Sequence, residues 1–451
     1  MGHTAQTPVH WLVNRVRDRT AKGIAVAVGE LIRDGELPPG TRLPTVRALA
    51  AGLGVSPATV ADSWGQLRAE QLISTGRRRG TTTLAPPDST PRDCFPGWSA
   101  IDLEQGLPDP VLLPPLEDAV AAGVRTERLN GFEHDYITPR LQAAVATTWP
   151  FAPEAWTVVA GGYEGTLLAC QAVAAPGELV AVEEPTAPRV LDTLRRSGIR
   201  VIGVRCDEEG PIPAALAEAL THNPVAFIYQ PRAHIPFGHT VSADRAAQLA
   251  DVLETNPDVS VVEDDNLGPL ASAPVASIGA HIPERLLLVR SYCKAYGLEL
   301  RSCVVAGAEH LVEQVRHKRG FGLVWASRIL QDAQAYLIND PATGVLIRQA
   351  RERYTHRRTT LADALRDRGF DVHSRDGLVL WVPVPDETRA MVALAGFGVA
   401  VAPGSRCYID PPAEHHIRIA TSHLPDDPPR VAELADLVAR AAATAPRDEF
   451  D

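Results

Sequence analysis

The stretch GELPPGTRLPTVRALAAGLGVSPATVADSWGQLRAEQLISTGRRRGTTTL, residues 35–84, decides the fold of the N-terminal part of the chain. Thr45 can cap one helix, and Gly54 can follow it in a tight turn. Ser56 can then cap another helix, whose proline at the first helical position forfeits no hydrogen bond. The apolar spacing of residues 20–34 predicts a preceding helix, so the whole pattern is that of a helix-turn-helix.

The last of these helices should have two distinct faces. Val60, Trp64 and Leu67 recur at helical spacing, so we expect them in the core. The other face carries short side chains, which allow close approach to a groove of DNA or another partner. These outward residues are Ala58, Thr59, Ala61 and Asp62.

A basic run follows the helices. The β-prone stretches LIST and TTTL flank GRRRG at residues 76–80, which predicts a hairpin that presents three arginines to phosphates or to a minor groove. Residues 1–84 hold 11 Lys and Arg against 6 Asp and Glu, whereas the whole chain has a net charge of −11. A basic segment in an acidic chain indicates a polyanionic partner.

This stretch closely resembles a GntR-type winged helix over its whole length. The resemblance implies that the module binds double-stranded DNA, with Arg42 and Arg47 at the backbone and base edges and Thr59 in the recognition helix. Many relatives have arginine where this chain has Pro57 and Ala61, so two base-reading side chains are missing and the operator should differ. In the wing the resemblance implies contacts from Arg77, Arg78, Arg79 and Gly80.

The pattern changes after this module, which we expect to occupy residues 1–84. Residues 85–100 hold four prolines without periodicity, which indicates a linker. In residues 101–451, short β-branched runs alternate with helical stretches rich in Ala and Leu. This alternation predicts an α/β domain with a largely parallel sheet covered by helices on both faces, whose ligand site lies at the strand ends. The runs are TVVAGG, LVAVEE, RVIGV, VAFIYQ, VSVVEDD, LLLVRS and SCVVAG.

One lysine of this domain stands out. Among 44 Lys and Arg residues the chain has only three lysines, Lys22, Lys294 and Lys318. A lysine can form a Schiff base with an aldehyde when burial or a neighbouring cation lowers its pKa, whereas arginine cannot. Lys294 comes soon after LLLVRS, so it is either such an amine or a surface lysine in a loop.

The segment RSYCKAYGLELR, with a serine three residues before Lys294 and an arginine seven after it, resembles the Schiff-base segment of fold-type I aminotransferases. Residues 101–440 are similar to the aminotransferase-like domain of the MocR subgroup of GntR regulators. The resemblance implies pyridoxal 5′-phosphate linked to Lys294, with its phosphate at an arginine and a helix N-terminus. The implied phosphate contacts are Ser291, Arg301, Gly162 and Tyr163.

The same resemblance assigns further roles in this pocket. Asp264 would pair with the pyridine nitrogen, with Asp265 as the alternative one position on. Arg418 matches the arginine that binds a substrate or effector carboxylate. A homodimer is implied, because such domains usually build their site across a dimer interface and winged helices usually read two half-sites. Gly106, Pro108 and Asp109 match the segment that lines the same pocket.

Several positions that contact the cofactor in that family are altered. Ala187 stands where an aromatic residue stacks on the ring, Ile235 where an asparagine bonds the ring hydroxyl, and Asn266 where Tyr or His is usual. Phe237 replaces a Thr or Ser, and GFEHDYITPRLQ lacks the glycine turn that presents a partner-subunit tyrosine. Each lost contact is worth about 0.5 to 1.5 kcal/mol. We expect covalent attachment and phosphate anchoring to outweigh these losses, but we expect no efficient aminotransferase activity and no catalytic residues.

The composition limits the remaining classes of protein. No apolar run approaches the roughly 20 residues that span a bilayer, and the N-terminus lacks the layout of a signal peptide, so we expect a cytoplasmic protein. The cysteines form no CxxC pair, which argues against a disulfide framework and a thiolate zinc site, and we expect no metal. They are Cys94, Cys170, Cys206, Cys293, Cys303 and Cys407.

Three hypotheses on function remain open. In the first, pyridoxal phosphate, or its adduct with a small amine or amino acid, occupies the C-terminal domain and biases the DNA-binding arms. In the second, the chain is a pyridoxal-phosphate enzyme with an added winged helix, and the altered ring contacts argue against it. In the third, the sensor no longer uses the cofactor and binds another ligand or a protein, which Ala187, Ile235 and Asn266 favour.

Overall fold

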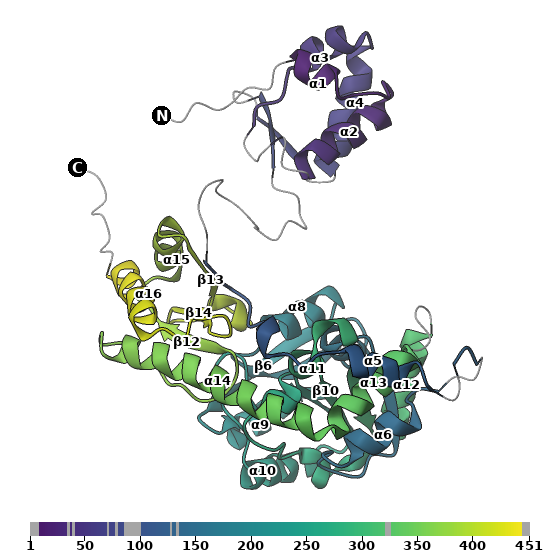
Figure 1. Cartoon of the computed structure of the whole chain (residues 1–451), viewed down its shortest axis with the longest axis vertical. Helices are drawn as coiled ribbons and strands as arrows, with labels where there is room; N and C mark the ends of the chain where they lie inside the picture. The colour runs from purple at the N-terminus through teal and green to yellow at the C-terminus, as the bar shows by residue number, and fades with distance from the viewer. Residues whose placement is uncertain are drawn as a thin grey trace. The chain divides into compact units, whose positions relative to one another are not determined.

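The computed structural model divides the chain into two compact units, residues 1–98 and 99–451, which are described separately below (Figure 1). Within the described residues no helix is both long enough and apolar enough to cross a membrane. The structure describes residues 9–33, 37, 41–69, 72–76, 80–84, 101–126, 129–131, 135–320 and 326–443.

Short helices and a hairpin build the first unit. Thr45 caps α3 by accepting a hydrogen bond from the Ala48 amide (3.2 Å), and Gly54 adopts the left-handed conformation (φ 69°) that ends this helix. Ser56 accepts from the Thr59 amide (3.1 Å) at the start of α4, as the sequence predicts. The elements are α1 (Val9–Val13), α2 (Ala21–Arg33), α3 (Val46–Leu53), α4 (Pro57–Ala69), β1 (Ile73–Gly76) and β2 (Gly80–Thr83).

One hydrophobic cluster holds these helices together. Val60, Trp64 and Leu67 of α4 are buried in it, at most 3% exposed, as their spacing predicts. They pack with Leu49 and Leu53 of α3 and with residues of α2. Ala58, Ala61 and Asp62 are exposed on the opposite face of α4, and Thr59 is half-buried. The two faces therefore separate as expected.

An eight-stranded sheet forms the centre of the second unit, in the order β4-β11-β10-β9-β8-β5-β6-β7. The five strands from β10 to β6 pair in parallel, while β11 runs antiparallel to both of its neighbours and β7 runs antiparallel to β6. The predicted largely parallel sheet is thus confirmed. The strands are β4 (Ala155–Val159), β5 (Leu179–Glu184), β6 (Arg200–Asp207), β7 (Gly210–Pro211), β8 (Ala226–Tyr229), β9 (Ser260–Asp265), β10 (Leu286–Ser291) and β11 (Cys303–Gly307).

Helices cover both faces of this sheet. Along β10, Leu286 and Leu288 belong to one hydrophobic cluster, whereas Leu287 and Val289 belong to another. Alternate residues of a strand point to opposite faces, so both faces of the sheet are buried. The helices around the sheet are α5 (Glu117–Gly123), α6 (Pro139–Ala146), α7 (Gly162–Val173), α8 (Pro188–Arg196), α9 (Pro213–Leu220), α10 (Ala243–Glu254), α11 (Cys293–Tyr296), α12 (Glu309–Arg319) and α13 (Arg328–Asn339).

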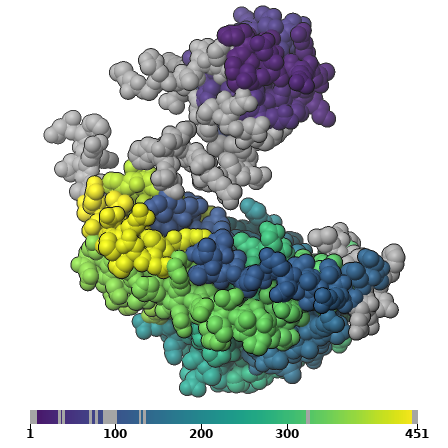
Figure 2. Space-filling model, viewed as in Figure 1, coloured from purple at the N-terminus to yellow at the C-terminus, as the bar shows by residue number. Residues whose placement is uncertain are grey.

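A smaller sheet, in the order β12-β14-β13-β3, packs with the C-terminal helices. Strand β3 comes from the start of the unit and pairs in parallel with β13, and its Leu103 packs in one cluster with Val431 of α16. The space-filling view shows this C-terminal helix in yellow beside the blue start of the unit (Figure 2). The elements are β3 (Ile101–Leu103), α14 (Pro341–Arg366), β12 (Val379–Pro383), α15 (Glu387–Gly396), β13 (Val399–Pro403), β14 (His416–Ala420) and α16 (Pro428–Ala442). Single 3-10 turns occupy Pro110–Leu112, Gly268–Leu270, Ile278–Ala280, Pro283–Arg285, Leu298–Leu300 and Ser405–Cys407.

Candidate functional site

In the first unit, the N-terminal side of α3 lies against the hairpin. Arg42 pairs with Thr82 of β2, so the segment before α3 extends the hairpin. Gly80 has φ 75°, and a Cβ at this position would lie 3.1 Å from Nε of Arg42. Arg42 and Arg47 are both exposed, while the Thr59 hydroxyl shares a hydrogen bond with Ser56 (2.9 Å). Arg77, Arg78 and Arg79 lie outside the described residues.

In the second unit, the candidate residues gather at the carboxyl ends of parallel strands. Asp264 is the penultimate residue of β9 and Ser291 is the last residue of β10, the neighbouring parallel strand. Lys294 follows β10 directly in the short helix α11. Strand order therefore brings together residues that are about 30 positions apart in sequence.

The start of α7 forms a cradle suited to an anion. Gly161 has φ 99°, and a Cβ there would lie 3.3 Å from the guanidinium carbon of Arg301. A Cβ on Gly162 would lie 3.2 Å from the Ser291 hydroxyl oxygen. The first amides of a helix have no partner within the helix, so those of Gly162 and Tyr163 are free to face a ligand. The predicted phosphate residues thus surround one small space.

Arg301 itself has an unusual backbone. Its φ is 45°, a left-handed conformation that costs a non-glycine residue about 1 to 3 kcal/mol. The side chain is exposed and its guanidinium lies against Gly161. The residue with the strained backbone is therefore the one whose guanidinium lies at the start of α7.

Lys294 is half-buried in a group of charges. Burial and the nearby Arg189 lower the pKa of its amine to about 7, while the Asp264 carboxylate acts in the opposite direction. Arg418 lowers this pKa further. Near neutral pH a large share of Lys294 is therefore the neutral amine, the form that attacks a carbonyl carbon.

Arg189 is the site residue that the sequence analysis missed. It lies in the first turn of α8, and its guanidinium pairs with the Asp264 carboxylate. The same guanidinium lies 5.8 Å from the ring centre of Tyr163 and 3.7 Å from where a Cβ of Gly162 would be. A signal was present in the sequence, because a cation near a helix N-terminus is unfavourable and needs an anionic partner. Arg189 occupies the space between Asp264 and the cradle.

The neighbouring aspartate has a different surrounding. Asp265 accepts hydrogen bonds from Arg232 (2.8 and 2.9 Å) and from Arg290 (2.7 Å). Although burial opposes the charge, these two guanidinium groups hold the pKa of Asp265 below its usual value. Successive residues of a strand face opposite sides, so Asp264, and not Asp265, faces Lys294.

The altered positions line the same region. Ala187 is buried (1% exposed) and Asn266 is nearly so (7%). Ile235 packs at the edge of a hydrophobic cluster, and its backbone exchanges hydrogen bonds with the Gln230 side chain (3.2 and 3.3 Å). Phe237 contacts the Trp381 ring edge-to-face at 6.0 Å. Apolar contacts therefore stabilise Ile235 and Phe237 at these positions.

Two other predicted pocket residues make internal bonds. Arg418 donates to the carbonyl of Glu104 (3.3 Å). Asp109 forms an ion pair with Arg357 (2.8 Å), so its carboxylate anchors α14. A Cβ on Gly106 would lie 3.1 Å from Leu378, which explains a glycine in this segment.

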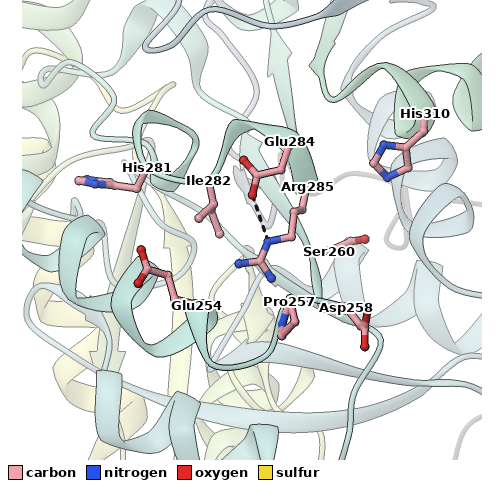
Figure 3. Close-up of a pocket in the computed structure, with 9 residues that line it drawn as sticks. All are labelled: Glu254, Pro257, Asp258, Ser260, His281, Ile282, Glu284, Arg285 and His310. Atoms are coloured by element: carbon pink, nitrogen blue, oxygen red, sulfur yellow. Dashed lines mark ion pairs between the residues drawn. The ribbon is translucent and has the colours of Figure 1, made fainter.

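A separate hollow of about 630 Å³ lies elsewhere (Figure 3). It is lined by Ser260, the first residue of β9, and by Arg285, which precedes β10. These are the amino ends of the strands, whereas Asp264 and Ser291 lie at the carboxyl ends. Arg285 pairs with Glu284 (3.5 Å) and donates to the Asn256 carbonyl (2.7 Å). In the part of the chain that the structure describes, this hollow is thus separate from the cluster around Lys294.

Comparisons with known proteins agree with both units. Residues 20–82 match the model of the bacterial regulatory proteins of the gntR family, and residues 101–433 match that of the aminotransferases of class I and II. The vitamin B6 salvage pathway transcriptional repressor PtsJ of Salmonella typhimurium is 32% identical, over 90% of this chain and 95% of its own length. The pyridoxine biosynthesis regulator PdxR of Corynebacterium glutamicum is 28% identical, over 75% of this chain and 77% of its own.

Solved structures match the second unit. Kynurenine aminotransferase of Pyrococcus horikoshii superposes with a TM-score of 0.69, at 20% identity, over 76% of this chain and 91% of its own. Aspartate aminotransferase of Thermus thermophilus superposes with a TM-score of 0.66, at 22% identity, over 76% of this chain and 92% of its own length. These likenesses establish the aminotransferase fold. The chain belongs to the GntR family of bacterial regulatory proteins, in the MocR subgroup that joins a winged helix-turn-helix to an aminotransferase-like domain.

Proposed function

We propose that this DNA-binding transcription regulator senses pyridoxal 5′-phosphate, or an amine or amino-acid adduct of it, in the pocket around Lys294. One observation carries the proposal. A lysine with a pKa lowered to about 7 lies in the same cluster as a glycine-lined helix N-terminus, a serine and an arginine. Residues 1–84 would bind DNA and residues 101–451 would bind the effector, with residues 85–100 as the linker.

The residues around Lys294 fit this cofactor. Ser291, Arg301 and the first amides of α7 would hold its phosphate, since guanidinium and free amide groups together suit a dianion. Lys294 would supply the amine that attaches it, and Asp264 would face the ring nitrogen. When bound, the cofactor supplies an electron-withdrawing ring and an electrophilic carbon that takes up amines.

Arg189 adds a step to binding. Its guanidinium pairs with Oδ2 of Asp264, so a bound ring nitrogen would share that carboxylate with Arg189 or displace it. Sensing would therefore couple ligand binding to a movement at the start of α8, in addition to any contact that Arg418 makes with an effector carboxylate.

We expect this regulator not to be an efficient aminotransferase. Turnover needs tuned ring electronics as well as occupancy. Ala187 offers no aromatic face to the ring, and Ile235 offers no side-chain hydrogen bond to its hydroxyl group. These altered positions therefore favour binding of the ligand over its turnover.

The names of the relatives support a sensor of vitamin B6 compounds. PtsJ is described as a repressor of vitamin B6 salvage, and PdxR as a regulator of pyridoxine biosynthesis. TauR of Rhodobacter capsulatus, 27% identical over 92% of this chain, is named a transcriptional regulator without such a link. The effector therefore has to be tested on this chain itself.

A second candidate function uses the same pocket without the cofactor. The Arg189–Asp264 pair favours it, since it already satisfies the carboxylate that the ring nitrogen would need. Arg301, Arg189 and Lys294 would then hold another small anion, such as a phosphate or carboxylate compound.

The absorption spectrum of the purified protein mixed with pyridoxal phosphate separates these candidates. The proposal expects a band near the visible edge that survives gel filtration, is lost in Lys294→Ala and is kept in Lys318→Ala, whose lysine is exposed on α12. A wild-type protein without the band, or a Lys294→Ala variant that keeps it, overturns the covalent assignment. Titration with inorganic phosphate then tests the anion sensor.

Assembly and location belong to the same proposal. We propose a homodimer, because a two-fold protein matches an operator with two half-sites, and a cytoplasmic protein, because its DNA target is there. Size-exclusion chromatography with light scattering tests the first point. A mass of one chain at micromolar concentration would contradict it.

A further inference from the structure

A buried group of three metal-ligating side chains lies beside the cofactor pocket. Glu183 ends the buried part of β5, Cys206 lies near the end of the neighbouring strand β6, and His239 lies in the loop before α10. One ligand atom of each, a carboxylate oxygen, the thiol sulfur and a ring nitrogen, lies within 4.8 Å of the other two. We propose that Glu183, Cys206 and His239 form a binding site for one Zn²⁺ ion.

Two of the three side chains carry buried polar atoms that make no hydrogen bond within the described residues. Glu183 and His239 are at most 1% exposed. Among the described residues, three of these atoms have no hydrogen-bond partner: both ring nitrogens of His239 and Oε2 of Glu183. Leaving such groups unsatisfied costs about 1 to 3 kcal/mol each, so three of them at one place favour a bound cation.

Neighbouring side chains hold Glu183 and His239 in place. Oε1 of Glu183 accepts hydrogen bonds from the backbone and side-chain nitrogens of Gln230, both at 2.9 Å, which leaves Oε2 for the ion. The His239 ring stacks on His234 with centres 3.9 Å apart. His234 cannot serve as a ligand, because its nitrogens contact the Pro185 carbonyl (3.0 Å) and the Phe237 amide (3.3 Å).

The distances and the charge suit zinc. Zn–S and Zn–N bonds of about 2.3 and 2.1 Å place two ligand atoms of a tetrahedral ion about 3.6 Å apart. The three side chains therefore have to move closer together to close the site. Thiolate, imidazole and carboxylate are the ligands that Zn²⁺ takes in proteins, and one thiolate with one carboxylate neutralises a divalent cation.

Burial of the cluster disfavours charge on its ligands. Burial raises the pKa values of the Glu183 carboxyl and the Cys206 thiol well above normal, and it lowers the pKa of His239 to about 3. Because zinc ligands must be deprotonated, Zn²⁺ binding should strengthen as the pH rises. Cys206 is half-buried, so it is the most exposed of the three ligands.

Two cations near His239 do not block the site. Arg245 is paired with Asp207 (2.9 Å) and Glu209 (3.3 Å). Arg375 is paired with Glu208 (2.9 Å). Carboxylates therefore compensate both charges. The sequence could not reveal this site, because its three ligands come from separate strands and loops and form no CxxC motif.

The test is the metal content of the tag-free, full-length protein after incubation with Zn²⁺ and dialysis. We expect one zinc per chain in the wild type and in Cys170→Ala, which removes a buried thiol elsewhere. We expect a loss of at least tenfold in retained zinc in Cys206→Ala and in His239→Ala. Circular dichroism verifies that each variant is folded.

Cobalt provides a second measurement that needs no variant. Co²⁺ bound to the wild type should give a thiolate charge-transfer band in the near ultraviolet, because Cys206 would be a direct ligand. The proposal is overturned if the dialysed wild type holds no zinc and gives no such band. It is equally overturned if Cys206→Ala and His239→Ala retain as much zinc as the wild type.

Discussion

The guanidinium of Arg189 and the carboxylate of Asp264 form an ion pair in the pocket around Lys294, with side chains 10% and 1% exposed. Arg189 lies in the first turn of a helix, whereas Asp264 is the penultimate residue of a central strand of the sheet. A pair buried to this extent is costly to break, because either partner left alone is an uncompensated charge. A ligand that takes Asp264 from Arg189 must therefore provide a cationic group in its place.

Replacing Arg189 by methionine should strengthen the binding of pyridoxal phosphate. The ring nitrogen would no longer compete with an internal cation, and a charged hydrogen bond is worth about 1.5 to 3 kcal/mol, so we expect an affinity at least about tenfold higher. Without ligand the variant should melt at a lower temperature, because Asp264 is left unpaired. Fluorescence titration and thermal unfolding measure both effects.

Arg196→Met is the matched control, since Arg196 lies exposed on the same helix and should change neither quantity. A weaker affinity in Arg189→Met would show that Arg189 contacts the ligand instead of competing with it.

Attachment of pyridoxal phosphate to Lys294 should depend on pH near neutrality. The pKa of this lysine is lowered to about 7, so its neutral amine is a minority below that pH and predominates above it. The rate at which the absorption band forms should rise with pH through about 7 and level off above about 8. Stopped-flow mixing at constant ionic strength measures it. A rate that still rises steeply between pH 9 and 10 would mean that Lys294 keeps an ordinary pKa.

The sequence could predict features that depend on neighbouring residues. Thr45 and Ser56 cap their helices as expected, because a cap needs only a hydroxyl at the right place in the chain. Each of the quoted β-branched runs contains a strand, because a buried strand shows itself in its own residues.

Features that depend on strand order could not be predicted in the same way. β11 inserts antiparallel between β10 and β4, which no local pattern announces. The choice between Asp264 and Asp265 depends on which face of β9 meets Lys294, and the contacts of Arg232 and Arg290 reveal it only in the structure. Arg189 was missed because its partner lies 75 positions away.

Asp265→Asn should destabilise the protein without touching the pocket. Asp265 is fully buried and compensates both Arg232 and Arg290, so the variant leaves buried positive charge and should lose about 3 to 5 kcal/mol of unfolding free energy. The lowered pKa of Asp265 means that its contribution is complete above the unfolded pKa and is lost as the pH falls through the folded one. Urea unfolding at pH 7 and at pH 3 should therefore show a smaller difference between variant and wild type at the lower pH.

Arg42→Ala and Arg47→Ala should weaken DNA binding. Both side chains are exposed beside the hairpin and the start of α3, where a winged helix meets DNA. A variant that loses one phosphate contact should reduce the salt slope of the binding constant by about 0.9, and one that loses a base contact should lose about 1 to 3 kcal/mol on the specific site. Gel shifts with the upstream region of the gene, at several salt concentrations, measure both quantities. Arg68→Ala, at the C-terminal end of α4, is the control, and equal losses in all three variants would place the contact surface elsewhere.

Sensing requires that DNA and the cofactor influence each other's binding. If pyridoxal phosphate changes the affinity for the operator by some factor, the operator must change the affinity for pyridoxal phosphate by the same factor, because the coupling free energy belongs to both sites. We expect a coupling of about 1 to 3 kcal/mol, or roughly 5- to 150-fold. Fluorescence titration of the cofactor with and without a saturating operator fragment gives one factor, and gel shifts with and without the cofactor give the other. Lys294→Ala should abolish both together. Cofactor binding that leaves the operator affinity unchanged would separate the pocket from regulation, because a ligand with equal affinity for both arrangements shifts neither.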